Sequence, residues 1–438
     1  MDLSRFARFK RLMEKWQIDP AFRSEAEGES SAFYSSEDPE LIPEAIHAIH
    51  QGNALNLPSN PYAREFCERF FRCSRYLSGL FQPSSFHDQD VYGYLQRVRS
   101  RCRMESALIR YHPNIYYYPL AFELSRGCRI GCDFCGLMAE RWSADAPYDR
   151  TFWRDIIRAS FDFLGPIAGE CPCYYATEPL DHPDYERFLD DVESITGHIP
   201  QTTTAAADRE PERIRGLIHR LGEDRLRDQG RLRLSIRSVR QFERIAELFS
   251  PEELAYVELL PNNRGSVYRV SDSGRNRANQ DREKYRYSIS CLTGIRVNLA
   301  DRTMTFIEPV LPDEAHPCGY RVLEKVTFDD AADYSEKLGS LFRHHAHAGL
   351  PKHETVRIHP EVQVKHETDQ ILLTADGVAY RIPKNRWNEQ ILQELAAGSS
   401  FADIFQSLGL PEKYETDVYD LLNRMFCSGY LVEQAVCS

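Results

Sequence analysis

The feature that most restricts the fold is an alternation of short β-branched runs with amphipathic stretches between about residues 112 and 310. Repeated βα units imply parallel strands joined by right-handed crossovers. About six such units predict an α/β fold built on a partial (β/α)6, TIM-like barrel, with its site at the carboxyl ends of the strands. Strands are predicted over 116–124, 171–176, 200–206, 232–236 and 256–260, helices over 151–164, 183–195 and 239–249, and a hairpin over 295–307.

Different patterns flank this barrel region, which we place at 106–330. Residues 1–105 are predicted to be a helical region, because Phe6, Phe9 and Leu12 recur at helical spacing. Residues 331–360 are predicted to be a helical linker. Residues 361–438 read as three short strands followed by three helices, the order of a winged-helix domain. Its last helix carries Asp417 and Asp420 against Arg424, which disfavours DNA as its partner.

Charge and hydropathy exclude some classes of partner. The 438 residues hold 54 Lys and Arg against 66 Asp and Glu, a net charge of −12, which argues against a protein that coats nucleic acid. The sequence contains no run of about 18 apolar residues, so it predicts no membrane span. The first residues lack the apolar stretch of a secretory signal. We therefore expect a cytoplasmic protein, whose 12 cysteines are free thiols, metal ligands or catalytic groups.

Three of these cysteines form the strongest chemical signal. Cys128, Cys132 and Cys135 follow the first predicted barrel strand at C-x3-C-x2-C spacing. Three thiolates on one loop can hold three irons of a [4Fe–4S] cluster and leave the fourth iron open to another ligand. A zinc site, the alternative, usually needs a fourth protein ligand, and no second CxxC or Cys/His pair stands at a suitable spacing.

The three-cysteine motif, with Phe134 before its last cysteine, resembles that of the radical S-adenosylmethionine (SAM) superfamily. The resemblance implies a [4Fe–4S] cluster on Cys128, Cys132 and Cys135, with SAM bound to its open iron. Residues 176–180 are similar to the turn that contacts the SAM amino group, although Ala176 and Thr177 replace its two glycines. The cofactor-binding residues that the resemblance implies are Phe134, Thr177, Glu178, Thr203, Ser235 and Arg237.

Residues 122–125, 176–185 and 6–24, together with the C-terminal module, look like those of proteusin-type peptide epimerases. These enzymes mature ribosomally made peptides. The resemblance implies a precursor peptide as substrate, whose leader adds a strand to the C-terminal sheet edge, and an electron donor such as flavodoxin or ferredoxin. It also implies conversion of L- to D-residues.

Epimerisation at Cα requires a hydrogen donor with a weak bond, and a neutral cysteine thiol meets this requirement. Cys318, in a turn past the last barrel strands, and Cys291, just before one of them, are the candidates. Two alternatives remain open: a radical SAM maturase that forms a C–C or C–S crosslink, and a catalytically silent peptide-binding protein. A basic, Gly/Ser/Asn-rich stretch at 264–286 is predicted to be a loop or lid.

Overall fold

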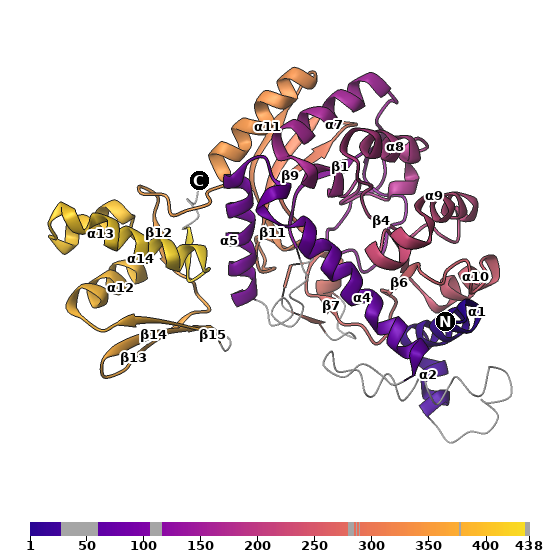
Figure 1. Cartoon of the computed structure of the whole chain (residues 1–438), viewed down its shortest axis with the longest axis horizontal. Helices are drawn as coiled ribbons and strands as arrows, with labels where there is room; N and C mark the ends of the chain where they lie inside the picture. Colours follow the sequence, from indigo (N-terminus) through magenta and orange to yellow (C-terminus); the bar gives the residue numbers. More distant parts are fainter. Residues whose placement is uncertain are drawn as a thin grey trace.

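The structure is a computed structural model that describes residues 1–27, 60–105, 116–278, 284–285, 287–288, 290–375 and 378–433. Figure 1 shows a large body of strands and helices, with a smaller domain (α12–α14, β13–β15) at one side. Among the helices of the described residues, none has the length and apolar character needed to cross a bilayer.

Parallel strands form one part of the large body. β4 (Thr202–Thr204), β5 (Leu232–Ile236) and β6 (Glu258–Pro261) pair in parallel in that order. Their inward positions are buried; Leu232, Leu234 and Ile236 are inaccessible to solvent. These three strands lie where the sequence predicts them, at shorter length for β4 and β6.

A second sheet has the order β1-β9-β10-β11. β1 (Tyr118–Glu123) pairs in parallel with β9 (Leu292–Asn298), which forms the expected hairpin with β10 (Thr303–Pro309), and β11 (Tyr320–Thr327) pairs antiparallel with β10. β9 therefore returns to the first strand rather than joining β6. The described strands form no closed barrel, and the partial (β/α)6 barrel stays a prediction.

The predicted strand over 171–176 is wrong. This segment is irregular and makes a single backbone hydrogen bond to β1, from the Phe122 N–H to the Pro172 carbonyl at 2.9 Å. Pro172 has no N–H to contribute to a ladder, which explains why strand pairing does not extend along the segment. The segment still lies between the two sheets, because the Tyr174 hydroxyl donates to Thr203 Oγ1 of β4 at 2.7 Å.

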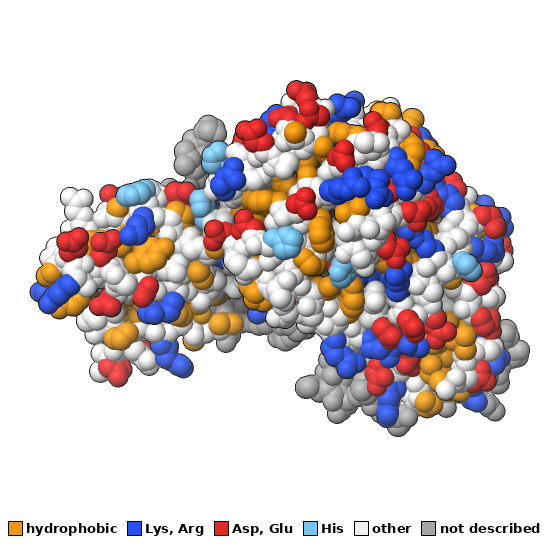
Figure 2. All heavy atoms as spheres, turned by 45° about the horizontal axis from the view of Figure 1, so that its top comes forward, with side chains coloured by type: hydrophobic (Ala, Val, Ile, Leu, Met, Phe, Trp, Pro, Cys, Tyr) orange, Lys and Arg blue, Asp and Glu red, His pale blue; other side chains and the backbone are white. Residues whose placement is uncertain are grey.

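Helices of the large body cover these sheets: α7 (Arg150–Leu164), α8 (Tyr185–Thr196), α9 (Pro211–Gln229), α10 (Val239–Leu248) and α11 (Ala331–His345). Asp149 is the N-cap residue of α7, and its carboxylate accepts a hydrogen bond from the Phe152 N–H. The inner face of the helix buries Trp153 and Ile156. Figure 2 shows the face that these upper helices present, on which basic and acidic side chains are interleaved.

The N-terminal helices pack on this body at two places. α1 (Leu3–Ile18) and α4 (Pro61–Leu80) share a small apolar core with Ala255, ahead of β6, and α2 (Pro20–Glu27) follows α1. α5 (Gln89–Glu105) instead enters the main core, where Tyr94 and Val98 are fully buried. The helical prediction for this region is confirmed for its described residues.

The C-terminal domain has its own core. β14 (Gln370–Ala375) lies between β13 (Gln363–His366) and β15 (Val378–Pro383), and α12 (Arg386–Ala397), α13 (Phe401–Leu408) and α14 (Glu415–Cys427) follow. The predicted order of three strands and three helices is confirmed. β12 (Val356–Ile358), within the predicted linker, pairs with β16 (Leu431–Glu433), and Val356 belongs to this domain's core.

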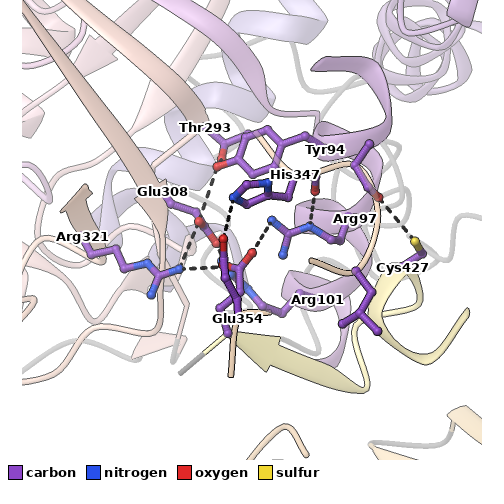
Figure 3. A network of polar contacts seen from close by, with 12 residues as sticks. Tyr94, Arg97, Arg101, Thr293, Glu308, Arg321, His347, Glu354 and Cys427 are labelled. Atoms are coloured by element: carbon purple, nitrogen blue, oxygen red, sulfur yellow. Dashed lines mark hydrogen bonds and ion pairs between the residues drawn. The ribbon is translucent and has the colours of Figure 1, made fainter. Parts of the chain in front are cut away.

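Buried charges join the C-terminal domain to the large body (Figure 3). Glu308 of β10, 1% exposed, pairs with Arg101 of α5 and, at 3.2 Å, with Arg321 of β11. Arg321 also lies 3.4 Å from Glu433 of β16, which in turn pairs with Arg97 of α5 at 3.3 Å. The junction is therefore a network of alternating charges in which each carboxylate has more than one cationic neighbour.

Candidate functional site

The loop with the three cysteines is held at both ends by backbone hydrogen bonds. It follows β1 through β2 (Ser125–Arg126), which pairs with β3 (Ala144–Asp145). The Cys128 N–H donates to the Glu140 carbonyl at 2.9 Å, and the Trp142 N–H donates to the Cys128 carbonyl at 3.3 Å. These bonds close residues 128–142 into a compact loop at the carboxyl end of β1.

A segment between β6 and β9 packs against this loop. It contains β7 (Val270–Ser271), the short helix η5 (Gly274–Ala278) and β8 (Lys284–Tyr285). Gly274 has φ of +55°, and a Cβ there would lie 2.4 Å from the Cys135 carbonyl oxygen, so only glycine allows the approach. The Arg275 N–H donates to that carbonyl at 2.9 Å.

The Arg275 side chain holds the same loop. Its guanidinium donates to the Cys132 carbonyl at 2.8 Å and to the Ala139 carbonyl at 2.5 Å. The basic stretch predicted to be a lid is thus, in its described part, packed against the cysteine loop. Arg264 adds an exposed ion pair to Asp133 at 3.4 Å.

A cavity of about 380 Å³ opens beside the cysteines. Cys128, Cys132 and Cys135 line it together with five of the six residues predicted to bind the cofactor. These five are Phe134, Thr177, Glu178, Thr203 and Ser235. The sixth, Arg237, is not among the lining residues; it pairs with Asp208 at 3.4 Å, and its charge lowers the pKa of Cys132 against the larger effect of burial. Four separate chain segments therefore bring the predicted residues to one cavity.

Glu178 is buried at the wall of this cavity. Its carboxylate accepts from the Thr204 hydroxyl, from the Leu180 N–H at 3.2 Å and from the Ala205 N–H at 2.9 Å. Burial raises the pKa of Glu178 to about 7, and these hydrogen bonds offset part of that rise. The carboxylate thus fixes the end of β4 to the turn that precedes α8.

Glu123, at the end of β1, orients the neighbouring turn. Its Oε1 accepts from the Ala176 N–H at 2.8 Å, and its Oε2 accepts from the Asn298 amide at 3.2 Å. The turn at 176–178 is therefore attached to both β1 and β9, although Ala176 and Thr177 stand where the resemblance expects glycines.

The pKa of Cys132 depends on burial and on the neighbouring thiols of Cys128 and Cys135. Burial raises the pKa of Cys128, and it raises that of Cys132 to about 12, with neighbouring Cys128 contributing to the rise, so bound metal would have to displace their protons. Within the described ranges, no three His, Cys, Asp or Glu side chains converge on one point that could hold a single ion. A cluster does not require such convergence, because each thiolate binds a different iron.

Neither of the two candidate hydrogen donors is among the residues that line the cavity. Cys318 is half-buried; burial raises its pKa, and the charge of Cys135 adds to that rise. The Gly274 N–H donates to the carbonyl of the preceding Pro317 at 2.6 Å. Cys318 thus belongs to the turn that abuts the cysteine loop.

Cys291 immediately precedes β9, and its carbonyl accepts from the Tyr118 N–H at 2.8 Å. It therefore sits at the amino end of the β1–β9 pair, whereas the cysteine loop leaves the carboxyl end of β1. Burial raises the pKa of Cys291, which keeps the thiol protonated. The charge of Arg233, a residue that lines the cavity, lowers the pKa of Cys291 against the larger effect of burial.

Sequence reasoning missed three residues that shape the site: Glu123, Arg275 and Asn276. Glu123 is a charged residue at the end of an otherwise apolar strand, and that break in the pattern could have revealed it. Arg275 and Asn276 lie in a loop-like stretch without a motif. Only the fold brings them to the cysteines.

The comparisons with known proteins give a relative of unknown activity. No protein-family model matches the chain, and no solved structure matches it. A match among curated proteins is the uncharacterized protein y4wI of Sinorhizobium fredii, 29% identical over 345 residues that cover 73% of this chain. The aligned region spans 65% of that relative's length.

Proposed function

We propose that the chain is a radical SAM enzyme, with a partial (β/α)6 barrel, that epimerises residues of a ribosomally made precursor peptide. One observation carries the first half of this proposal: the three cysteines share a cavity with five residues that the resemblance assigns to the cofactor. Those residues come from four segments far apart in sequence. If the three cysteines had only an incidental structural role, there would be no reason for them to share a cavity with these five residues.

In the proposed site, Cys128, Cys132 and Cys135 would hold three irons of a [4Fe–4S] cluster, and SAM would occupy the cavity beside it. When bound, this pair would supply the radical chemistry that removes a hydrogen atom from a substrate carbon. The protein keeps the reacting groups in place and shields them from water. Arg275 fixes the cysteine loop, and Glu123 and Glu178 fix the turn at 176–178.

Return of hydrogen to the opposite face of Cα completes the epimerisation. The S–H bond of Cys318 or Cys291 breaks and a C–H bond forms on the inverted carbon. The sulfur radical that remains then regains one electron from a flavodoxin or ferredoxin and one proton from solvent. Both thiols have raised pKa values because of burial, so the S–H bond that this step needs is present at neutral pH.

The C-terminal domain is the proposed site for the leader of the precursor peptide. β13 and β15 are the edges of its sheet, and every residue of β13 is exposed. An extended peptide can pair with such an edge through main-chain hydrogen bonds. We propose a cytoplasmic location, where thiols stay reduced. Nucleic acid is not the proposed partner, because the net charge of −12 disfavours binding to phosphates.

The test is a reaction in deuterium oxide with anaerobically reconstituted protein, SAM, a one-electron reductant and synthetic peptides encoded by short open reading frames beside its gene. Epimerisation adds one deuterium per inverted residue and yields D-residues on hydrolysis. A product two mass units lighter without D-residues would favour the crosslinking maturase. SAM that stays uncleaved in the presence of an intact cluster would contradict radical SAM chemistry altogether.

A further inference from the structure

One polar group in the wall of the cavity has no explanation within the protein. Asn276 lines the cavity beside Cys135 and is only 2% exposed. Its Oδ1 atom is buried, and among the described residues it has no hydrogen-bond partner. Buried polar side-chain atoms are nearly always paired, so an unpaired one on a residue that lines a cavity points to a ligand group.

The backbone around Asn276 is firmly attached to the cysteine loop. The Gly274 N–H donates to Pro317, the Arg275 N–H donates to Cys135, and the Asn276 N–H donates to the Ser273 carbonyl at 3.1 Å. The Arg275 guanidinium adds two further bonds to the same loop. The backbone of Asn276 is therefore held next to the cysteine loop.

Several other polar side chains in the cavity already have partners inside the protein. Thr203 Oγ1 accepts from the Tyr174 hydroxyl, and Arg233 pairs with Glu258 at 2.9 Å. Ser271 donates to Ser273 at 2.9 Å. Asn276 differs from these groups because its Oδ1 atom has no hydrogen-bond partner among the described residues. This atom therefore suits an uncharged ligand group that presents a donor.

The surroundings of this carboxamide suit a planar, weakly polar group. Leu260, Val270, Tyr287 and Phe134 line the same cavity. Adenine is such a group, and the favoured partner of an asparagine carboxamide is the adenine edge, where the 6-amino group donates to Oδ1 and N7 accepts from Nδ2. In the proposed complex, SAM is the ligand that would bring an adenine into this cavity.

We infer that Asn276 recognises the adenine base of SAM, with Oδ1 accepting a hydrogen bond from the 6-amino group. This inference rests on the proposed function, because it requires SAM in the cavity. It makes Asn276 a specificity-determining residue for the base and assigns a ligand to a residue of the stretch 264–286, which the sequence predicts to be a loop or lid.

The test measures binding rather than turnover, with S-adenosylhomocysteine as the probe, because it carries the same base and cannot be cleaved to the radical. Its affinity for the reconstituted wild-type protein is compared with that of the analogue whose base lacks the 6-amino group. The inference predicts that the wild type binds the analogue about tenfold more weakly.

Two variants separate recognition from a merely structural role. Asn276→Leu should bind S-adenosylhomocysteine about tenfold more weakly than the wild type and should no longer distinguish it from the analogue. Asn276→Asp keeps an acceptor oxygen and should retain the discrimination. Iron content and thermal unfolding of each variant show whether the cysteine loop and the fold are intact.

Equal affinity of wild type and Asn276→Leu for S-adenosylhomocysteine, or equal discrimination by both, would overturn the inference, since Asn276 would then face a different ligand. If Asn276→Leu fails to fold, the discrimination by the wild type and by Asn276→Asp decides the question. An intact cluster in wild-type protein that binds neither probe would instead contradict the proposed function, and that result is distinguishable from the others.

Discussion

The guanidinium of Arg275 donates a hydrogen bond to the carbonyl of Cys132 at 2.8 Å across 143 residues of sequence. A second hydrogen bond from the same guanidinium goes to the Ala139 carbonyl. One side chain therefore links two positions of the cysteine loop, Cys132 and Ala139. The loop itself has exposed positions on both sides of Cys132. Its shape therefore depends on a segment that belongs to another part of the chain.

Replacing Arg275 should loosen the cysteine loop. Arg275→Ala removes both carbonyl contacts, and we expect the variant to retain less iron after reconstitution and to lose it faster on exposure to a chelator. Arg277→Ala is the matched control, because its guanidinium bonds the Asp313 carbonyl instead of the loop. Equal iron retention in the two variants would show that Arg275 is not needed to shape the site.

The hydrogen donor can be identified by serine substitution, since an O–H bond is too strong to donate a hydrogen atom to a carbon radical. Cys318→Ser and Cys291→Ser should both still cleave SAM. The variant that lacks the donor should form no D-residue, whereas the other should form it as the wild type does. Normal D-residue formation in both variants would remove the two thiols from the mechanism.

Glu178 gives a pH dependence of stability whose sign follows from its environment. Burial raises its pKa to about 7 from 4.5, so between those pH values the folded protein holds a proton that the unfolded chain has lost. The contribution of Glu178 to stability should therefore be greatest below pH 4.5, fall as the pH rises towards 7, and level off above it. The loss is about 3 kcal/mol at most, from 1.36 kcal/mol for each unit.

Urea unfolding of wild type and Glu178→Gln at pH 5 and pH 8 tests this prediction. Glutamine does not titrate, so the difference in unfolding free energy between the two proteins should change by up to about 3 kcal/mol in this interval. The absolute stability of Glu178→Gln can be lower, because its amide nitrogen faces the Ala205 N–H. A constant difference at both pH values would mean that Glu178 titrates near its ordinary pKa.

The junction in Figure 3 should depend on Glu308. Glu308→Gln leaves Arg101 and Arg321 without their shared carboxylate in a buried setting, and we expect a loss of about 3–5 kcal/mol in unfolding free energy. Glu324→Gln on β11 is the control; its carboxylate is 40% exposed and pairs with His345, so its loss should stay below about 1 kcal/mol. Similar losses in the two variants would show that the buried network contributes no more to the unfolding free energy than an exposed ion pair does.

The sequence predicts local elements well where their pattern is amphipathic. β5 has the predicted bounds, and α7 and α10 each differ from the predicted bounds by one residue. The helix α9 was not predicted, because Gly216 and Gly222 and a run of charged residues hide its apolar stripe. The pairing of β9 with β1 was not foreseen either, since it depends on contacts between remote strands.

Some residues of the candidate site can likewise be predicted from the sequence, and others cannot. The three cysteines and the strand-end positions Thr203 and Ser235 can be found from spacing and resemblance, because strand ends meet at one edge of a sheet. Asn276 and Arg275 cannot, because their roles arise from the close approach of Gly274 to Cys135. That approach depends on a packing contact between two loops, which no local pattern encodes.

The most direct test of the account is the metal content of anaerobically purified and reconstituted protein, measured together with SAM cleavage. The account predicts about four irons and four sulfides per chain, cleavage of SAM to 5′-deoxyadenosine and methionine under reducing conditions, and loss of both in Cys132→Ala. Protein that carries zinc on this loop, or that binds no metal there, would contradict it.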